Sequence, residues 1–318
     1  MKVLITGGAG FLGQHLAASL LKKGHCIEVL DDLSTSKNVF SINTNQNLSF
    51  IQGSILDQQL VSTLIQRTEL VIHLAAIVGV SNVMNSPLRG LQTNVLGSEL
   101  IIRTCHVNSV PIVLTSSSEI YGKNDSGPLS ELSDRVIGVP QISRWSYSDS
   151  KAIEEAFALA YFKEKNLSVK IVRLFNTVGP GQRSEFGMVL PSFIESAMSH
   201  QDIIVHGTGL QKRCFMHVID AVSGITKVIE SDKAIGSVYN LGNPSEITIL
   251  DLAKKVKEIS HSKSKIVFRS HKDVYGEDFQ DMDSRFPDIT KAESELGWKP
   301  FKSLDEIIQE SIDFYNQA

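Results

Sequence analysis

The first fifteen residues constrain the fold of this chain more than any other stretch. Lys2 to Ile5 is an apolar run of strand length, and a glycine-rich turn from Thr6 to Gly13 follows it directly. An apolar-periodic helix begins at the end of that turn. A strand, a glycine turn and a helix in this order are typical of the first unit of a parallel α/β sheet. Glycine spacing alone would also suit an ordinary tight turn, so this interpretation needs support from the next strand.

The three glycines of the turn would have separate tasks in such a unit. Gly7 would permit the tight turn, and Gly10 would let a pyrophosphate approach the backbone. Gly13 would let the helix pack closely against the strand. The helix N-terminus would face the anion with its free N–H groups. The turn therefore predicts a site for a dinucleotide.

An acidic residue at the end of the second expected strand supports that prediction. The strand covers residues 26–30 and ends in Asp31, about 20 residues after the glycine turn. A carboxylate there can accept hydrogen bonds from the ribose hydroxyls, and it would repel a 2′-phosphate. NAD is therefore favoured over NADP as the cofactor. The alternative is that Asp31 is only a turn residue in Asp31-Asp32-Leu33-Ser34.

Strand-like and helix-like segments alternate through the first half of the chain. Further strands are expected at residues 48–52, 70–74, 111–115 and 169–174, and further helices at about 57–67, 87–108 and 145–165. Repeated βα units of this length predict an α/β fold with a Rossmann-type, doubly wound parallel sheet and right-handed crossovers. Ligands of such a sheet bind beyond the carboxyl ends of the strands.

The pattern changes after Asn176, where glycine and polar residues become frequent. Helices are expected at residues 189–200, 218–230, 249–260 and 304–315, and strands at 203–206, 238–241 and 266–269. We predict a dinucleotide-binding domain over residues 1–176 and a smaller α/β lobe for the substrate over residues 177–318. Some segments of that lobe are expected to return to the main sheet.

Composition excludes several classes of function. The net charge of −4 gives no reason to expect a nucleic-acid or anionic-membrane partner. The three cysteines are far apart in the sequence, so neither a disulfide framework nor a zinc site is expected. We found no signal peptide and no run long enough to span a membrane, which predicts a cytoplasmic protein.

A tyrosine and a lysine at helical spacing are the candidates for chemistry. Tyr147 and Lys151 are four residues apart at the start of the expected helix at 145–165, so they share one face of it. A lysine cation beside a phenol favours the phenolate, which could then act as a base near neutral pH. Tyr161 and Lys165 have the same spacing but lie at the far end of the helix, where we interpret them as a solvated or packing pair.

Together these features resemble one family. The glycine turn, His73-Leu74-Ala75-Ala76, the serine-rich strand end at residues 116–118 and the Tyr147/Lys151 pair are similar to the extended short-chain dehydrogenase/reductases. Three later strings fit as well: Arg173-Leu174-Phe175-Asn176-Thr177-Val178-Gly179-Pro180, Asn240-Leu241-Gly242-Asn243-Pro244 and Leu296-Gly297-Trp298-Lys299-Pro300. The resemblance covers nearly the whole chain. It implies an NAD-dependent epimerase, dehydratase or decarboxylase that acts on a nucleotide sugar.

The resemblance also implies roles for individual residues. Tyr147 would take the proton of the sugar O4 hydroxyl, Ser117 would hydrogen-bond to that oxygen, and Lys151 would lower the pKa of the tyrosine and hold the ribose. The substrate would further contact Ser118, Asn176, Arg213 and Arg285. The cofactor would contact Gly7, Gly10, Phe11, Leu12, Gly13, Asp31, Ser34, Ser54, Ile55, Leu74, Ala75, Ala76, Asn94, Tyr147 and Lys151. Ser54 departs from the family, which usually has an aspartate there that contacts the adenine amino group.

The pair Ser118-Glu119 bears on which reaction follows oxidation at C4. Dehydratases of the dTDP-glucose type carry Asp-Glu at this place, whereas Ser-Glu resembles UDP-glucuronate decarboxylases and GDP-mannose 4,6-dehydratase. Glu119 is therefore a further candidate catalytic residue. Four more strings favour the decarboxylases: Arg144-Trp145-Ser146-Tyr147, Gln211-Lys212-Arg213-Cys214-Phe215, Tyr275-Gly276 and Arg285-Phe286-Pro287-Asp288.

UDP-glucuronate decarboxylation is thus the first hypothesis. A 4-epimerase of UDP-hexoses and a 4,6-dehydratase are the enzymatic alternatives, and a dinucleotide sensor without turnover is the alternative of another class. The expected partners are a nucleotide sugar, most simply a UDP-sugar, and a second copy of the chain. The family commonly forms homodimers through two long helices, which correspond here to residues 94–106 and 145–165.

Overall fold

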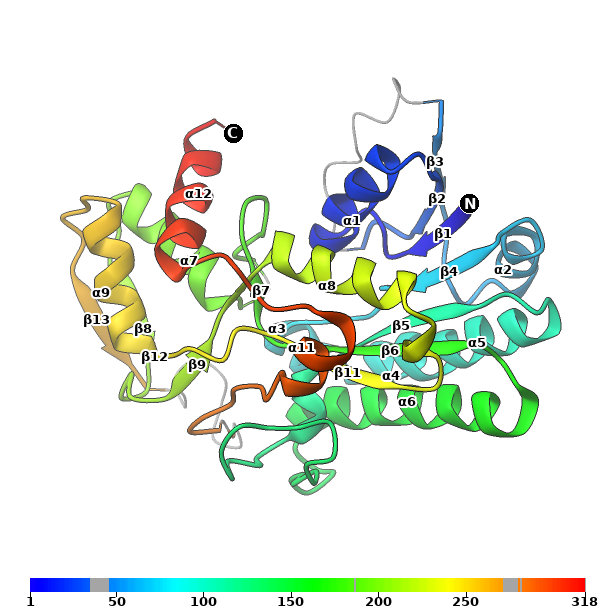
Figure 1. Ribbon diagram of the computed structural model, residues 1–318. Helices are drawn as coiled ribbons and strands as arrows, with labels where there is room; N and C mark the ends of the chain where they lie inside the picture. The colour runs from blue at the N-terminus through cyan, green and yellow to red at the C-terminus, as the bar shows by residue number, and fades with distance from the viewer. Residues whose placement is uncertain (35–45, 186, 271–279, 281, 318) are drawn as a thin grey trace.

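A seven-stranded parallel sheet forms the centre of the molecule (Figure 1). The computed structural model describes residues 1–34, 46–185, 187–270, 280 and 282–317. The strands follow the order β3-β2-β1-β4-β5-β6-β11, and every neighbouring pair is parallel. Their bounds are β1 (Lys2–Thr6), β2 (Cys26–Asp31), β3 (Leu48–Gln52), β4 (Leu70–His73), β5 (Ile112–Ser117), β6 (Val169–Leu174) and β11 (Val238–Leu241). The predicted doubly wound α/β sheet is confirmed.

Helices cover both faces of the sheet, and each face has its own apolar core. One face carries α1 (Phe11–Lys22), α8 (Val218–Glu230) and α11 (Thr290–Leu296). The other carries α2 (Gln58–Ile65), α5 (Ser98–Val107) and α6 (Ser146–Lys165). The central strands β1, β4 and β5 are buried on both faces, so they read as largely continuous apolar runs in the sequence rather than as alternating ones. Within the described residues, no helix has the length and apolar character needed to cross a membrane.

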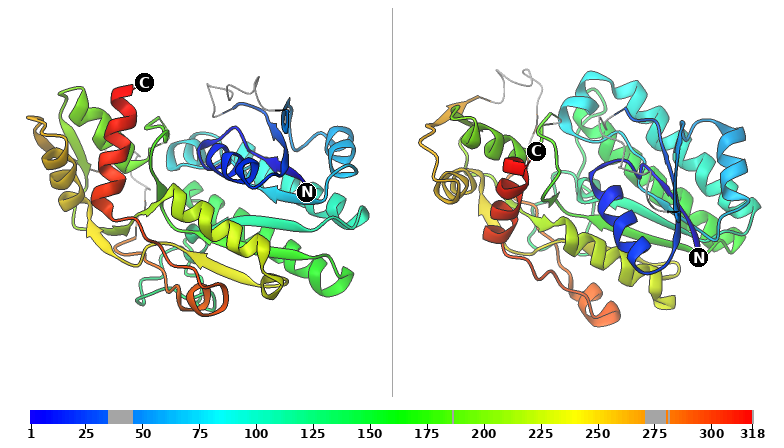
Figure 2. Two further views of the ribbon diagram at one scale, coloured as in Figure 1. Left: turned by 45° about the horizontal axis from the view of Figure 1, so that its top comes forward. Right: turned by 90° about the horizontal axis from the view of Figure 1, so that it is seen from above.

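A smaller group of elements stands to one side of the sheet (Figure 2). It consists of α7 (Val189–Met198), α9 (Ile249–Ile259) and α12 (Leu304–Gln317), which share an apolar core with the paired strands β8 (Ile203–His206) and β13 (Ile266–Arg269). Two further strand pairs connect it to the sheet: β9 (Lys212–Cys214) with β12 (Glu246–Thr248), and β7 (Thr177–Val178) with β10 (Met216–His217). Between these elements, α8 and β11 return to the main sheet, so the lobe is not continuous in sequence. The division at residue 176 remains a prediction.

The long helix expected at residues 87–108 is interrupted. It is divided into α4 (Pro87–Leu91), a π-helical segment η2 (Gln92–Gly97) and α5, and a short helix α3 (Val80–Asn85) precedes it. A π-helical turn inserts extra backbone into an α-helix and often occurs at functional sites. Here it contains Asn94, whose carboxamide bonds to backbone outside the helix. Apolar periodicity cannot distinguish this segment from a regular α-helix.

Gly13 allows helix α1 to pack against the glycine turn, and a side chain there should destabilise the fold. A Cβ atom on Gly13 would lie 2.5 Å from Cα and 2.6 Å from the carbonyl oxygen of Gly8, and backbone atoms cannot move away cheaply. We expect Gly13→Ala to lower the free energy of unfolding by about 1–3 kcal/mol, as overpacking does. Urea denaturation followed by circular dichroism measures this loss.

Gly90→Ala is the matched control for that prediction. Gly90 is also a helical glycine, on α4, but a Cβ atom there would meet no atom within 4 Å among those described. Replacing a helical glycine by alanine without a clash is neutral or stabilising. Equal stabilities of the Gly13→Ala protein and the unsubstituted chain would show that the close approach at Gly13 is not required.

Candidate active site

A cavity of about 1060 Å³ lies at the carboxyl ends of the strands, between the sheet and the smaller lobe. Its volume exceeds that of most single-ligand sites, which suits a dinucleotide together with a second ligand. All but one of the contact residues predicted from the sequence line it: Gly7, Gly10, Phe11, Leu12, Gly13, Asp31, Ser34, Ser54, Ile55, Leu74, Ala75, Ala76, Ser117, Ser118, Glu119, Tyr147, Lys151, Asn176, Arg213 and Arg285. The exception is Asn94.

The glycine turn forms one end of the cavity and suits a pyrophosphate. Gly7 has a φ of 70°, and a Cβ atom there would lie 2.6 Å from the backbone nitrogen of Ala75. The turn can therefore approach the loop after β4 only with glycine at this position. Gly10 is the N-cap of α1 and offers no side chain to its first N–H groups. Those donors remain suited to an anion.

Asp31 lies where a ribose would have to be recognised. Its carboxylate accepts hydrogen bonds from the backbone nitrogens of Ala9 (3.0 Å) and Leu33 (2.8 Å), which fixes its position at the end of β2. Burial raises the pKa of Asp31, and the two backbone bonds oppose that rise. The turn role and the cofactor role are therefore compatible, because one carboxylate oxygen can accept more than one hydrogen bond.

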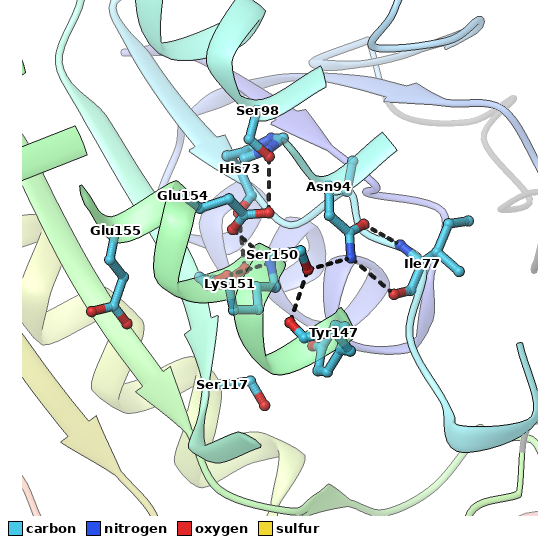
Figure 3. Close-up of polar contacts among 12 residues, drawn as sticks. His73, Ile77, Asn94, Ser98, Ser117, Tyr147, Ser150, Lys151, Glu154 and Glu155 are labelled. Carbon is cyan, nitrogen blue, oxygen red and sulfur yellow. Dashed lines mark hydrogen bonds and ion pairs between the residues drawn. The ribbon is translucent and has the colours of Figure 1, made fainter. Parts of the chain in front are cut away.

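Tyr147 and Lys151 project from the first turns of α6 toward the end of β5 (Figure 3). Lys151 Nζ donates to the carbonyl oxygen of Thr115 at 3.1 Å. Burial is the largest influence on Tyr147 and raises its pKa, while Lys151 and a hydrogen bond with Ser117 lower it. The lysine thus acts in the predicted direction, but in the protein without ligands it does not outweigh burial. The positive charge of an oxidised nicotinamide would add to the effect of Lys151.

The other end of the cavity holds a cluster of three charges. Glu119 Oε2 lies 2.8 Å from Arg144 Nη1, and its Oε1 lies 2.7 Å from Arg285 Nη2. Burial alone would raise the pKa of Glu119, but the two arginines outweigh it and hold that pKa well below its usual range. Glu119 is therefore a carboxylate across the whole physiological pH range, held between two guanidinium groups.

Arg285 retains unused donors within this cluster. Its side chain is 5% exposed, and neither Nε nor Nη1 has a hydrogen-bond partner among the described residues. Unpaired buried donors cost free energy, so their presence in a cavity wall indicates an anionic or strongly accepting ligand. Arg213 and Asn176 line the same region; Asn176 Nδ2 donates to the carbonyl oxygen of Cys214 at 2.8 Å.

Comparison with known proteins agrees with this geometry. The model of a family described as GDP-mannose 4,6-dehydratase matches residues 4–311. The chain belongs to this family of extended short-chain dehydrogenase/reductases. A relative from Bacillus cytotoxicus, UDP-N-acetyl-alpha-D-glucosaminuronate decarboxylase, is 35% identical over 99% of this chain and 98% of its own length. UDP-glucuronic acid decarboxylase 1 of Danio rerio is 32% identical over 99% of this chain and 73% of its own length.

A solved structure shows the same fold with ligands of the expected kinds. It is a variant of the UDP-glucuronic acid 4-epimerase from Bacillus cereus, in complex with UDP-4-deoxy-4-fluoro-glucuronic acid and NAD. The TM-score is 0.89 at 26% identity, over 100% of this chain and 99% of that one. Members of this family with a nucleotide-sugar substrate and NAD thus share the whole architecture of the chain.

Two predicted residues have structural partners that the sequence did not reveal. Asn94 is 1% exposed and lies behind the cavity wall, where its carboxamide bonds to the backbone of Ile77 and to Ser150 of α6 (Figure 3). It can therefore affect the cofactor only through the position of these elements. Ser54, which replaces the family's usual aspartate, lines the cavity and accepts a hydrogen bond from the backbone nitrogen of Leu56 at 3.1 Å.

The alternative pair at the far end of α6 does not reach the cavity. Tyr161 packs against His106 of α5, with ring centroids 5.5 Å apart, and Lys165 is exposed. The string Tyr275-Gly276 lies outside the described residues. Arg144 belongs to one of the motifs but was not predicted as a site residue. Its position three residues before Tyr147, in the short 3₁₀ turn η4 (Ser143–Trp145) that leads into α6, was the signal that could have identified it.

The C-terminal helix also contributes to the cavity unexpectedly. Ser311, Phe314 and Tyr315 line its wall. They belong to the last turns of the amphipathic helix α12, and none of the motifs includes them. Tyr315 Oη lies 3.1 Å from Ser199 Oγ, after α7. A contact between α7 and α12 cannot be inferred from either helix alone, because both are amphipathic and could pack in many places.

Proposed function

We propose that this protein is an NAD-dependent decarboxylase of a UDP-linked uronic acid, with glucuronate or N-acetylglucosaminuronate as the sugar. The observation that carries the proposal is the charge cluster of Glu119, Arg144 and Arg285, which lines the same cavity as Tyr147 and in which Nε and Nη1 of Arg285 have no partner among the described residues. The sugar of a UDP-hexose is neutral and would offer these donors only hydroxyl groups. A uronate has a carboxylate at C6, and the unused donors of Arg285 match it.

The residues around Tyr147 support oxidation at C4 of the sugar. We infer that Tyr147 accepts the proton of the O4 hydroxyl, that Ser117 holds the same oxygen, and that the ammonium of Lys151 stabilises the phenolate. NAD, when bound, supplies the acceptor for the hydrogen at C4. The glycine turn would hold its pyrophosphate and Asp31 its adenosine ribose. The product of this first step is a 4-keto sugar.

The state of Glu119 favours decarboxylation over dehydration. Removal of water across C5 and C6 needs a base at C5 and an acid for the departing hydroxyl. Glu119 is held as an ion pair with two arginines, so its basicity is low, and its neighbour is Ser118 rather than a carboxylic acid. A 4-keto uronate needs no base at C5, because its carboxylate is β to the ketone. When the C5–C6 bond breaks and carbon dioxide leaves, the C4 ketone takes up the electron pair as an enolate, and C5 then gains a proton. C4 would then regain hydride from reduced NAD.

The second candidate is 4-epimerisation of the same kind of substrate. It is favoured by the structural likeness to the UDP-glucuronic acid 4-epimerase of Bacillus cereus. An epimerase would use the same tyrosine, lysine and arginines, but it would let the ketone rotate and return hydrogen to the opposite face. The relatives from Bacillus cytotoxicus and Danio rerio, both decarboxylases over nearly all of this chain, give decarboxylation the first place.

We further propose that the chain forms a homodimer through the face of η2 and α6. Most apolar residues of this region pack on the sheet: Leu100 and Ile101 are buried, and Phe157, Leu159 and Phe162 join the same core. Leu96 is nevertheless 59% exposed and Ile153 of α6 is 40% exposed. These exposed apolar side chains suit a helical dimer interface.

We also propose a cytoplasmic location, which agrees with the free thiols of Cys26, Cys105 and Cys214.

Incubation with single substrates tests the proposed reaction. We expect the NAD-supplemented protein to convert UDP-glucuronate or UDP-N-acetylglucosaminuronate into a product lighter by carbon dioxide, as measured by mass spectrometry. UDP-glucose and UDP-N-acetylglucosamine should remain unchanged in mass. A product of unchanged mass with inverted C4, detected by NMR, would replace decarboxylation by epimerisation. Loss of water from a neutral sugar would contradict both.

A further inference from the structure

A second buried carboxylate lies directly beside the lysine of the site. Glu154 follows Lys151 by three residues on α6, and its Oε2 is 2.8 Å from Lys151 Nζ (Figure 3). The side chains are 0% and 4% exposed. Together with the carbonyl oxygen of Thr115, Glu154 holds the ammonium from two sides. None of the motifs that indicated Tyr147 and Lys151 includes Glu154.

A chain of hydrogen bonds supports this carboxylate from behind. Ser98 Oγ of α5 donates to Glu154 Oε1 at 2.9 Å and lies 2.8 Å from His73 Nε2 at the end of β4. The other ring nitrogen of His73, Nδ1, lies 2.6 Å from Thr6 Oγ1 at the end of β1. Residues from three separate elements are thus connected to a single carboxylate oxygen.

The proton positions along this chain follow from its donors. A hydroxyl has one proton, so Ser98, which donates to Glu154, must accept from the Nε2–H group of His73. The Nδ1 atom of His73 then accepts from the Thr6 hydroxyl. Burial lowers the pKa of His73 to about 3, so the ring is neutral and can have this arrangement. Every proton of the chain therefore points toward Glu154. Burial raises the pKa of Glu154, and the charge of Lys151 and the hydrogen bonds from Lys151 and Ser98 oppose that rise and favour the ionised form.

The negative charge of Glu154 acts on both groups of the catalytic pair. Burial is the largest influence on Lys151 and lowers its pKa, but Glu154, Tyr147 and Glu155 together outweigh burial and hold that pKa above its usual range, with Glu154 the largest of the three. The same charge raises the pKa of Tyr147 and so opposes the effect of Lys151 on the phenol. Glu154 thus keeps the lysine charged and at the same time opposes the lowering of the Tyr147 pKa by that lysine.

The other charged groups that face this pair are balanced by partners of their own. Glu119, in the 3₁₀ turn η3 (Ser118–Tyr121) after β5, pairs with Arg144 and Arg285. Glu155, the neighbour of Glu154 on α6, pairs with Arg173 of β6 at 2.8 Å. Among the described residues facing Tyr147 and Lys151, Glu154 is thus the carboxylate whose charge partner is the catalytic lysine itself.

We propose that Glu154 is a positioning residue that holds Lys151 in place and sets the pH at which Tyr147 becomes a base. The proposal rests on the role proposed above for Tyr147. Removing the anion at position 154 favours loss of a proton from the pair of Tyr147 and Lys151. Glutamine still offers Lys151 Nζ an acceptor oxygen, and the carbonyl oxygen of Thr115 remains, so we expect Lys151 to stay in place and the phenol to release that proton. A neutral glutamine at position 154 should therefore shift the ionisation of Tyr147 downward.

The ionisation of Tyr147 can be measured without turnover. Tyrosinate absorbance is followed against pH in the NAD-loaded protein and in its Tyr147→Phe variant, and the difference isolates residue 147. The same difference is measured between the Glu154→Gln protein and the protein that carries both Glu154→Gln and Tyr147→Phe. We expect the midpoint for Tyr147 to fall by about one pH unit in the Glu154→Gln protein. An unchanged midpoint, or a rise, would overturn the proposal. Because no substrate is used, this result is independent of whether the enzyme is a decarboxylase.

Two further variants keep the test decisive. Glu164→Gln removes an exposed carboxylate from the same helix and should leave the midpoint where it was. A shift in that control as large as that in Glu154→Gln would refute a role specific to Glu154. Ser98→Ala retains the carboxylate but removes the proton that Ser98 directs at it, so the charge acting on Tyr147 is less compensated and the midpoint should rise. If Glu154→Gln does not fold, a midpoint that is unchanged or falls in Ser98→Ala overturns the proposal. In the assay of the Glu154→Gln protein with UDP-glucuronate, the acidic limb of the plot of kcat against pH should move to lower pH, as the Tyr147 midpoint does, while KM stays constant.

Discussion

Tyr147→Phe should reduce turnover by about a thousandfold or more while the protein remains folded. The substitution removes only the phenolic oxygen, and with it the group positioned to accept the O4 proton beside Lys151 and Ser117. General acid–base catalysis by one residue typically contributes 10² to 10⁴ in rate. The ring stays in place, so the melting temperature and the binding of NAD should change little. Product formation followed by mass spectrometry measures the loss in kcat.

Tyr161→Phe is the matched control for that experiment. Tyr161 has a lysine at the same spacing on the same helix, but it packs against His106 and lies outside the cavity. Its loss should leave the rate within about twofold, as is usual for a substitution away from the site. If Tyr147→Phe retained most of its activity, or if Tyr161→Phe lost it, the assignment of the base would have to be abandoned. A reduced nicotinamide signal that persists in Tyr147→Phe after UDP-sugar is added would also contradict the assignment of Tyr147 as the base.

Arg285→Met should lower kcat/KM for a UDP-uronate by about a hundredfold or more. The substitution keeps the length and the apolar body of the side chain but removes its charge. Truncating one partner of a buried, hydrogen-bonded charge pair costs 2–5 kcal/mol or more. Two losses are expected here, because the arginine contacts Glu119 at 2.7 Å and because we propose that its remaining donors bind the substrate carboxylate. The substitution removes one of the two guanidinium groups that contact Glu119.

A comparison of charged and neutral ligands shows where Arg285 acts. We expect Arg285→Met to weaken the binding of UDP-glucuronate far more than the binding of UDP-glucose, as measured by isothermal titration calorimetry with NAD present. Arg269→Met, which removes an exposed arginine of β13 outside the cavity, should leave both affinities unchanged. An equal loss for both ligands would show that Arg285 binds the nucleotide rather than the sugar carboxylate. That outcome would remove the main support for a uronate substrate.

The glycine turn shows why so much of the nucleotide half could be predicted from the sequence. Gly7, Gly10 and Gly13 are local requirements, because a tight turn, a close approach and a packed helix each exclude a Cβ atom at one position. The buried strands were equally clear, since a parallel sheet covered on both faces needs continuous apolar runs. The i, i+4 spacing of Tyr147 and Lys151 likewise requires both residues to share one helical face, whatever the helix packs against.

Other features of the site depend on contacts between distant segments. Arg144, Glu119 and Arg285 come from three separate stretches, and their pairing gives Glu119 a permanent charge that no local motif could indicate. The sequence suggested that Lys151 would make Tyr147 a base, but burial by the surrounding elements raises the pKa of that phenol in the protein without ligands. The segment around Asn94 was also expected to be regular helix. It is π-helical in the structure, and the carboxamide of Asn94 bonds to the backbone of Ile77, a contact that apolar periodicity does not indicate.

The sequence by itself determined the sheet, the cofactor end of the cavity and the identity of the tyrosine–lysine pair, since each depends on residues within one turn, one strand or one helix. The tertiary structure alone decided which charges meet. It placed two arginines on Glu119, placed Glu154 on the catalytic lysine, and brought α12 to the cavity wall. Electrostatic interactions depend on distance and burial, and neither can be read from the order of residues along a chain.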